Sequence, residues 1–132
     1  MTEIVITSAK RSPIGKFMGT LASLSAPELG KLALDAVISD CKFEKDVIDE
    51  IIMGQVLTGG AGQNPARQAS ISAGIPIEKS ALTINQVCGS GLRAVSVAAQ
   101  SILTNQSNVV IAGGQESMSN APVSYTHLTL PT

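Results

Sequence analysis

The sequence predicts an α/β fold built on a mainly parallel sheet. Short apolar runs at residues 4–7, 51–57, 81–87 and 108–112 have the length of buried strands. Segments with helical patterning separate these runs, and strands that alternate with helices favour parallel pairing through right-handed crossovers. The run at residues 51–57 is apolar on both of its faces, which is typical of a strand in a sheet covered on both sides.

The first strand candidate, at residues 4–7, is followed by a loop. Residues 10–22 mix glycine, proline and basic side chains, as loops do. Lys10, Arg11 and Lys16 in this loop are predicted to form a solvated patch and not a ligand site.

A helix is predicted from Ser25 to about Asp40. Ser25 suits the N-cap, Pro27 lies in the first turn and Glu28 follows the serine by three residues, which together form a helix-start signature. One apolar stripe is expected to pack on the sheet while the charged residues face water. The stripe consists of Leu29, Leu32, Ala33, Ala36 and Val37.

The glycine-rich loop at residues 58–64 leads into a second predicted helix. Pro65 is well tolerated in the first turn of a helix, and Gly74 is expected to end it. Arg67 and Gln68 are the polar side chains of interest in this helix. They are expected to brace the neighbouring loop through hydrogen bonds and not to take part directly in chemistry.

Cys88 lies between the strand candidate at residues 81–87 and a helix predicted from residue 92 to residue 104. The thiolate is the reactive form of cysteine, and the N–H groups at a helix start favour negative charge and can hold a developing oxyanion. Gly89 and Gly91 give a substrate close access to the sulfur. The alternative is that Cys88 is a buried, small apolar residue, as free cysteines commonly are.

The helix after Cys88 is unusually apolar. Arg93 is its only charged residue, and apolar side chains cover most of its circumference. A helix that is apolar all round is buried on all sides. We therefore expect it to lie between two layers, with its N-terminus aimed at the site that holds Cys88.

A nucleotide-binding motif competes with this interpretation. Gly89, Gly91 and Ala94 match the G-x-G-x-x-G/A fingerprint, and Glu116 lies roughly where the ribose-binding acid is expected. Nucleotide binding, however, gives no role to Cys88, and Glu116 follows a pair of glycines and does not end a strand. Dinucleotide binding is therefore the weaker hypothesis.

Bulk properties exclude several classes of function. The 132 residues favour one domain, and a net charge of −1 provides no basic face for nucleic acid or an anionic membrane. The N-terminus lacks the apolar region of a secretory signal, and no run is long enough to span a bilayer. Cys41 and Cys88 have no metal-ligand spacing, so Cys41 is expected to be structural. These features predict a cytoplasmic protein without a metal site.

Four blocks of the sequence resemble the thiolase family, in its acetyl-CoA acetyltransferase branch. They are IVITSAKRSPIGKFMGTLA at residues 4–22, GQNPARQAS at 62–70, NQVCGSGLRAV at 85–95 and GGQESMSNAP at 113–122. Four blocks in the family's order are more specific than any single motif. The resemblance implies a layered thiolase fold of two similar halves. Residues 1–122 would be an incomplete N-terminal domain, with the helix after Cys88 in the middle layer.

The resemblance also implies the chemistry. Cys88 matches the family's cysteine that is acylated by the thioester substrate, and it is the only residue here to which a catalytic role transfers. Coenzyme A thioesters are the implied substrates, with no separate cofactor, and the full-length protein is implied to be a homo-oligomer. Two alternatives stay open: a condensing enzyme of the same fold, and a non-catalytic thiolase-like partner subunit.

The rest of the family's machinery has no counterpart in this chain. The activating histidine, the second cysteine and part of the oxyanion site belong to the other half, so the chain alone is expected to be inactive. General acid–base assistance is typically worth about 10²–10⁴ in rate. The nearly uncharged segment at residues 80–112 is likewise expected to expose a large apolar patch.

The last ten residues, 123–132, depart from the family pattern. They resemble the translation of a sequencing-library adapter, so a non-native tail is expected there. His127, the only histidine, lies within it and is not taken as a catalytic base.

Overall fold

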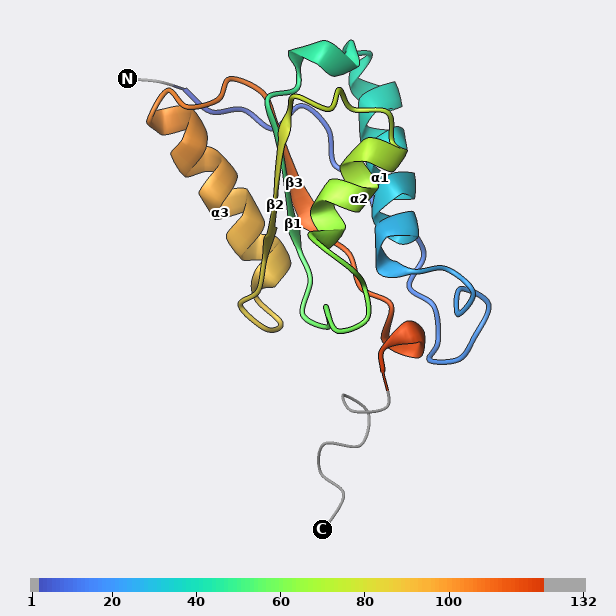
Figure 1. The fold of residues 1–132 in the computed structure, drawn as a ribbon. Helices are drawn as coiled ribbons and strands as arrows, with labels where there is room; N and C mark the ends of the chain where they lie inside the picture. The colour runs from blue at the N-terminus through green and yellow to red at the C-terminus, as the bar shows by residue number, and fades with distance from the viewer. Residues whose placement is uncertain (1–2, 123–132) are drawn as a thin grey trace.

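The computed structural model describes residues 3–122, which form a parallel three-stranded sheet with helices on both faces (Figure 1). The strands are β1 (Glu50–Gly54), β2 (Ser80–Ile84) and β3 (Val110–Gly114), in the order β2-β1-β3. Helix α3 (Ser90–Leu103) covers one face, and α1 (Ala26–Cys41) and α2 (Pro65–Ser72) cover the other. Two short 3-10 helices are η1 (Lys45–Val47) and η2 (Met118–Asn120). The predicted α/β class with a mainly parallel sheet is confirmed, whereas the predicted tail lies outside the described residues.

Strand β1 is central and buried on both faces, as its apolar pattern predicts. Ile51 and Ile52 are fully buried, and they belong to different core clusters because successive side chains of a strand point to opposite faces. Ile52 is level with Leu82 of β2 and Ala112 of β3. The strand ends at Gly54, before the predicted limit of residue 57.

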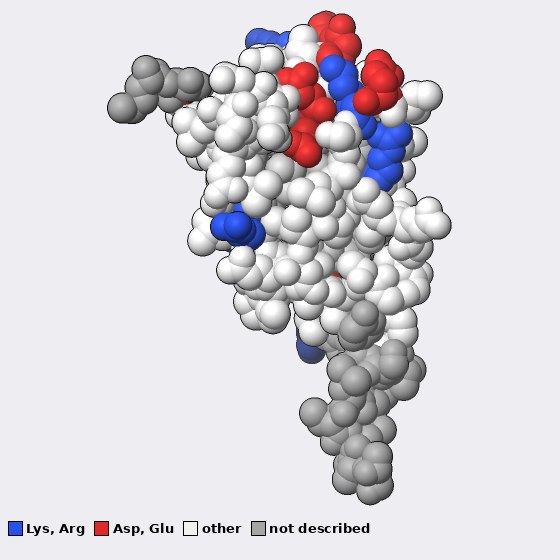
Figure 2. Space-filling model, turned by 60° about the vertical axis from the view of Figure 1, so that its left-hand side comes forward, with Lys and Arg blue, Asp and Glu red and all other residues white. Residues whose placement is uncertain are grey.

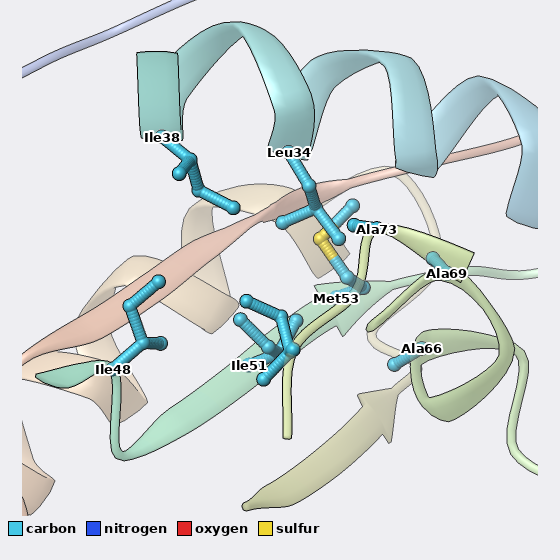
Figure 3. Packing of buried hydrophobic residues seen from close by; sticks show 9 residues of the cluster. Leu34, Ile38, Ile48, Ile51, Met53, Ala66, Ala69 and Ala73 are labelled. Atoms are coloured by element: carbon cyan, nitrogen blue, oxygen red, sulfur yellow. The ribbon is translucent and has the colours of Figure 1, made fainter. Parts of the chain in front are cut away.

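The larger core cluster lies between β1 and the helices α1 and α2. Figure 3 shows Leu34 of α1 and Met53 of β1 pointing toward each other, with the alanines of α2 beside them. Ala66 and Ala69 are fully buried, and their small side chains let α2 lie close to the sheet. A Cβ on Gly30 of α1 would overlap the side-chain oxygen of Gln115 and lie 3.2 Å from the Cβ of Ala69, so the glycine leaves room for Gln115 and lets α1 pack closely on α2.

Helix α1 begins where its start signature predicts. The N–H of Glu28 donates to the Ser25 hydroxyl at 3.4 Å, and the N–H of Ser25 donates to the Glu28 carboxylate at 2.7 Å. This capping box satisfies N–H groups that have no partner inside the helix.

The predicted apolar stripe of α1 is wrong. The face that packs carries Gly30, Leu34 and Ile38, whereas Leu32 is 50% exposed and Ala36 is also exposed. The other three stripe residues, Leu29, Ala33 and Val37, are half-buried beside the true contact line. Apolar residues occur around most of this helix, so the sequence pattern admits more than one rotation about the axis. The close packing of Gly30 against the buried Gln115 side chain and against Ala69 of α2 selects one of them.

This correction predicts unequal effects for two leucines of α1. Leu34→Ala should lower the free energy of unfolding by about 2–4 kcal/mol, because it leaves a cavity in the core. Leu32→Ala should lower it by less than about 1 kcal/mol, because that side chain is half in water. Urea unfolding of both variants measures the difference. Equal losses of unfolding free energy in the two variants would support the apolar stripe predicted from the sequence.

The predicted strand at residues 4–7 does not form. These residues have no ladder partner among the described residues, and Val5 and Ile6 are 66% and 78% exposed. A cleft of about 470 Å³ borders them, and β3 residues line it as well. The segment is held instead through Asp40, which accepts a hydrogen bond from Ser8 at 2.6 Å and pairs with Lys10 at 2.9 Å.

Helix α3 is buried along one face only. Ala94 and Ala98 pack on the sheet, whereas Leu92 is 79% exposed and Leu103 is 52% exposed. Figure 2 brings the α3 side forward and shows charged side chains gathered near the top, with few over the middle of that face. Within residues 3–122, α3 is therefore not buried on all sides as expected. The exposed apolar surface that the sequence predicts is present. No helix in this range is both long and apolar enough to cross a membrane.

Asp49 joins the beginnings of β1 and β3. Its carboxylate accepts hydrogen bonds from the N–H groups of Asn108 at 2.7 Å and Val109 at 3.1 Å, and its own N–H donates to the Val109 carbonyl at 2.9 Å. The hydrogen bonds from Asn108 and Val109 favour the ionised carboxylate and hold the pKa of Asp49 below its ordinary value, and the bond from Asn108 has the largest effect.

The lowered pKa of Asp49 predicts a pH-dependent stability. The stabilisation is fully present above the unfolded-state pKa, about 3.9, and is lost as the pH falls through the lower folded-state pKa. Urea unfolding between about pH 7 and pH 3 should therefore show a loss on acidification that is smaller in Asp49→Asn. Asp46→Asn, at an exposed aspartate in η1, should keep the full pH dependence. An unchanged dependence in Asp49→Asn would contradict this account.

Candidate active site

Cys88 is exposed and lies in the short loop between β2 and α3. The next residue, Gly89, is the N-cap of α3. The predicted arrangement of strand, cysteine and helix is therefore present, although β2 ends at Ile84 and not at residue 87. The alternative of a buried Cys88 is wrong for the described chain, whereas Cys41, expected to be structural, is half-buried.

Two side chains hold the backbone around Cys88. The hydroxyl of Ser90, a residue only 4% exposed, accepts from the N–H of Gln86 at 2.8 Å and donates to the carbonyl of Val87 at 2.6 Å. The side-chain oxygen of Asn85 accepts from the N–H of Val87 at 2.9 Å. The loop backbone is thus fixed on both sides of an exposed thiol.

Val87, immediately before Cys88, has a φ of 49°. A β-branched residue in this left-handed region is an outlier, because its side chain crowds the backbone. Such a conformation costs on the order of 1–3 kcal/mol and persists only where its surroundings enforce it. The strain was not predicted from the sequence, since nothing in the letters around Val87 signals a positive φ.

Three glycines let the N-terminus of α3 rest directly on the sheet. A Cβ on Gly54, the last residue of β1, would lie 2.6 Å from the carbonyl carbon of Ser90. A Cβ on Gly114, the last residue of β3, would lie 3.5 Å from the Cα of Gly91. Gly114 belongs to β3, which extends beyond the apolar run predicted to end at residue 112. Gly54 was missed, although a glycine within a buried strand often marks a close backbone approach.

The helix start carries fewer available donors than expected. The N–H groups of Gly89 and Ser90 already donate to the carbonyls of Gln86 at 3.0 Å and Val87 at 3.1 Å, so they are not free to bind an oxyanion. The N-cap residue makes no side-chain hydrogen bond to the helix. No side-chain acceptor at the N-cap therefore competes with the cysteine for the positive end of the helix dipole.

Glu116 binds the backbone and not a ribose. Its carboxylate accepts from the N–H of Val56 at 2.8 Å and from the N–H of Leu57 at 3.0 Å, in the loop that follows β1. The nucleotide-binding hypothesis therefore loses its acidic residue. Asn85 reaches the same loop, because its side-chain N–H donates to the carbonyl of Val56 at 3.3 Å.

Arg67 and Gln68 brace loops, as predicted. The guanidinium of Arg67 donates to the carbonyls of Lys79 at 2.5 Å and Ile77 at 2.6 Å. The side-chain amide of Gln68 donates to the carbonyl of Ala61 at 2.6 Å. Arg67 thus braces the segment that leads into β2, and Gln68 braces the loop that precedes α2.

A cleft of about 650 Å³ adjoins the first turn of α3. Gly91 and Leu92 form part of its wall, and the predicted basic patch of Lys10, Arg11 and Lys16 forms another part. Within residues 3–122, no group of three or more metal-ligating side chains comes together. His127 lies outside the described residues.

Comparison with known proteins places these features in a family. The family described as "Thiolase, N-terminal domain" matches residues 4–130. The chain is 53% identical over 122 residues to an acetyl-CoA acetyltransferase of Cupriavidus necator, and 54% identical over 122 residues to a probable acetyl-CoA acetyltransferase of Escherichia coli. Each alignment covers 92% of this chain and 31% of the relative. The mitochondrial acetyl-CoA acetyltransferase of Rattus norvegicus is 45% identical, covering 92% of this chain and 29% of its own length.

A solved structure agrees with the same assignment. The Acat5 thiolase of Ascaris suum, in complex with coenzyme A, superposes with a TM-score of 0.82 at 44% sequence identity. The match covers 84% of this chain and 29% of that one. The chain thus spans less than a third of the length of these relatives.

Proposed function

This chain belongs to the thiolase family, whose N-terminal domain it carries, and on that premise we propose that Cys88 is the acyl-accepting nucleophile of an acetyl-CoA acetyltransferase. The observation that carries the proposal is an exposed thiol held by a fixed loop at the N-terminus of α3. The positive end of a helix favours a thiolate, which is the nucleophilic form. The thiol is exposed, so a thioester can approach the sulfur.

The first half of the reaction follows from the chemistry of a thiolate. The sulfur of Cys88 attacks the carbonyl carbon of an acyl-CoA, a new carbon–sulfur bond forms, and the bond from the acyl carbon to coenzyme A breaks. Coenzyme A leaves as a thiolate and takes up a proton. A second acyl-CoA, deprotonated at its α-carbon, then attacks the acyl group: a carbon–carbon bond forms, the bond to the Cys88 sulfur breaks, and the thiolate is regenerated. The covalent intermediate divides one difficult step into two easier ones.

The substrate class comes from the relatives. The compared relatives are named acetyl-CoA acetyltransferases, and the Ascaris suum thiolase is described in complex with coenzyme A. We therefore assign acetyl-CoA or a related acyl-CoA thioester to this chain as substrate, without a separate cofactor. A cytoplasmic homo-oligomer is proposed for the full-length protein, and the mitochondrial name of the rat relative marks the alternative location.

Mass spectrometry tests the proposal directly. The purified chain is incubated with acetyl-CoA, and its peptides are mapped for acetyl thioesters. We expect acetylation at Cys88 and not at the half-buried Cys41, with slow or absent turnover because the acid–base partners are not among these residues. Absence of acetylation at a folded, alkylatable Cys88 would count against the proposal.

A further inference from the structure

We propose that Asn85 is a positioning residue for Cys88: its side chain holds Val87 in the left-handed conformation that fixes the cysteine at the start of α3. The inference rests on the proposed function, since it takes Cys88 as the nucleophile. Asn85 itself is not assigned a contact with the substrate.

Asn85 links two loops through both ends of its amide group. Its oxygen accepts from the N–H of Val87 at 2.9 Å, and its nitrogen donates to the carbonyl of Val56 at 3.3 Å. Asparagine suits this place because one short side chain supplies both a donor and an acceptor. The orientation of the amide follows from its partners, because an N–H must meet the oxygen and a carbonyl must meet the nitrogen.

The hydrogen-bond chain continues beyond Val56. The carbonyl of Val56 and the N–H of Leu57 belong to one peptide group, and that N–H donates to the carboxylate of Glu116 at 3.0 Å. A second oxygen of Glu116 accepts from the N–H of Val56 at 2.8 Å. The anionic carboxylate thus fixes the peptide on which Asn85 depends, and hydrogen bonds arranged in a chain polarise and strengthen one another.

The other side of the loop does not depend on Asn85. Ser90 holds Gln86 and Val87 through its hydroxyl, and Gly54 and Gly114 seat the helix. Loss of the asparagine amide therefore removes one of the two side-chain hydrogen bonds to the strained Val87. We expect the loop to relax locally, with Val87 leaving the left-handed region, while α3 stays in place.

The test is the alkylation of Cys88 by iodoacetamide in the purified chain, measured across pH with Cys41 as an internal reference. Asn85→Ala should slow the alkylation of Cys88 about two- to fivefold near neutral pH, because the sulfur loses its fixed place at the start of α3. The Cys41 rate should not change. The control is Asn108→Ala, at an exposed asparagine before β3, which should match the parent chain.

A rescue experiment separates positioning from a general loss of structure. Glycine adopts a positive φ freely, so Val87→Gly added to Asn85→Ala should restore most of the Cys88 rate. Glu116→Gln should reproduce a weaker form of the Asn85→Ala effect, with Glu78→Gln at an exposed glutamate as its control. An Asn85→Ala profile equal to that of the parent, or no rescue by Val87→Gly, would overturn the proposal. If Asn85→Ala unfolds the chain, shown by fast alkylation of Cys41, the Glu116→Gln profile decides.

Alkylation needs no acyl-CoA, so the two proposals fail separately. Absent acetyl transfer together with a clear Asn85 effect would count against the function alone. Normal acetyl transfer without an Asn85 effect would count against the positioning role alone.

Discussion

Replacing Cys88 by alanine is expected to abolish incorporation of acetyl groups from acetyl-CoA. The variant removes the only exposed thiol among residues 3–122 and leaves the loop backbone free to form the same hydrogen bonds, because the bonds around Cys88 come from Asn85 and Ser90. Cys88 carries the only thiol in this loop, and the thiolate is the nucleophilic form of cysteine. Quantitative peptide mapping after incubation with acetyl-CoA measures the loss.

Two companion variants make the Cys88 result specific. Cys41→Ala, which removes the half-buried thiol, should retain acetyl incorporation at the parent level. Cys88→Ser keeps the size of the side chain, but its hydroxyl is not ionised at neutral pH, so incorporation should fall to nearly the level of Cys88→Ala. If Cys88→Ala were still acetylated at another residue, that residue and not Cys88 would be the acyl acceptor.

Replacing Gly54 by alanine is expected to destabilise the chain by about 2–3 kcal/mol. The new methyl group would lie 2.6 Å from the carbonyl carbon of Ser90 and 2.7 Å from the backbone nitrogen of Gly91. Backbone atoms cannot turn aside as a flexible side chain can, so the start of α3 must shift away from the sheet. Urea unfolding measures the stability, and alkylation of Cys88 reports the displaced helix start.

Gly113→Ala is the matched control for Gly54→Ala. It also places a methyl group on a strand glycine, but the nearest heavy atom is the sulfur of Met53 at 3.8 Å, an ordinary van der Waals contact. Its stability should stay within about 0.5 kcal/mol of the parent or rise slightly, because alanine lowers the entropy of the unfolded chain. Equal losses of stability in the two variants would show that neither strand position tolerates a side chain. That result would contradict a specific role of Gly54 in the close contact between β1 and the start of α3.

The sequence determined the features that depend on near neighbours along the chain. The start of α1 follows from the pairing of Ser25 with Glu28, the burial of β1 from its continuous apolar run, and the start of α2 from Pro65 after the glycine-rich loop. The placement of Cys88 between a strand and a helix is of the same kind. Each of these features is stabilised by groups within a few residues, so the local pattern carries the information.

The tertiary structure alone decided how these elements meet. The rotation of α1 depends on the packing of Gly30 against Gln115 and Ala69, and β3 pairs with β1 and not with the segment at residues 4–7. At the site, Asn85 bonds to Val56, 29 positions away, and Leu57 bonds to Glu116, 59 positions away. Such contacts form only when the sheet brings the ends of its strands together. The strain at Val87 is a consequence of that meeting, and no local pattern encodes it. A glycine in a buried strand, such as Gly54, indicates a close backbone approach, but only the fold shows that the start of α3 is what approaches.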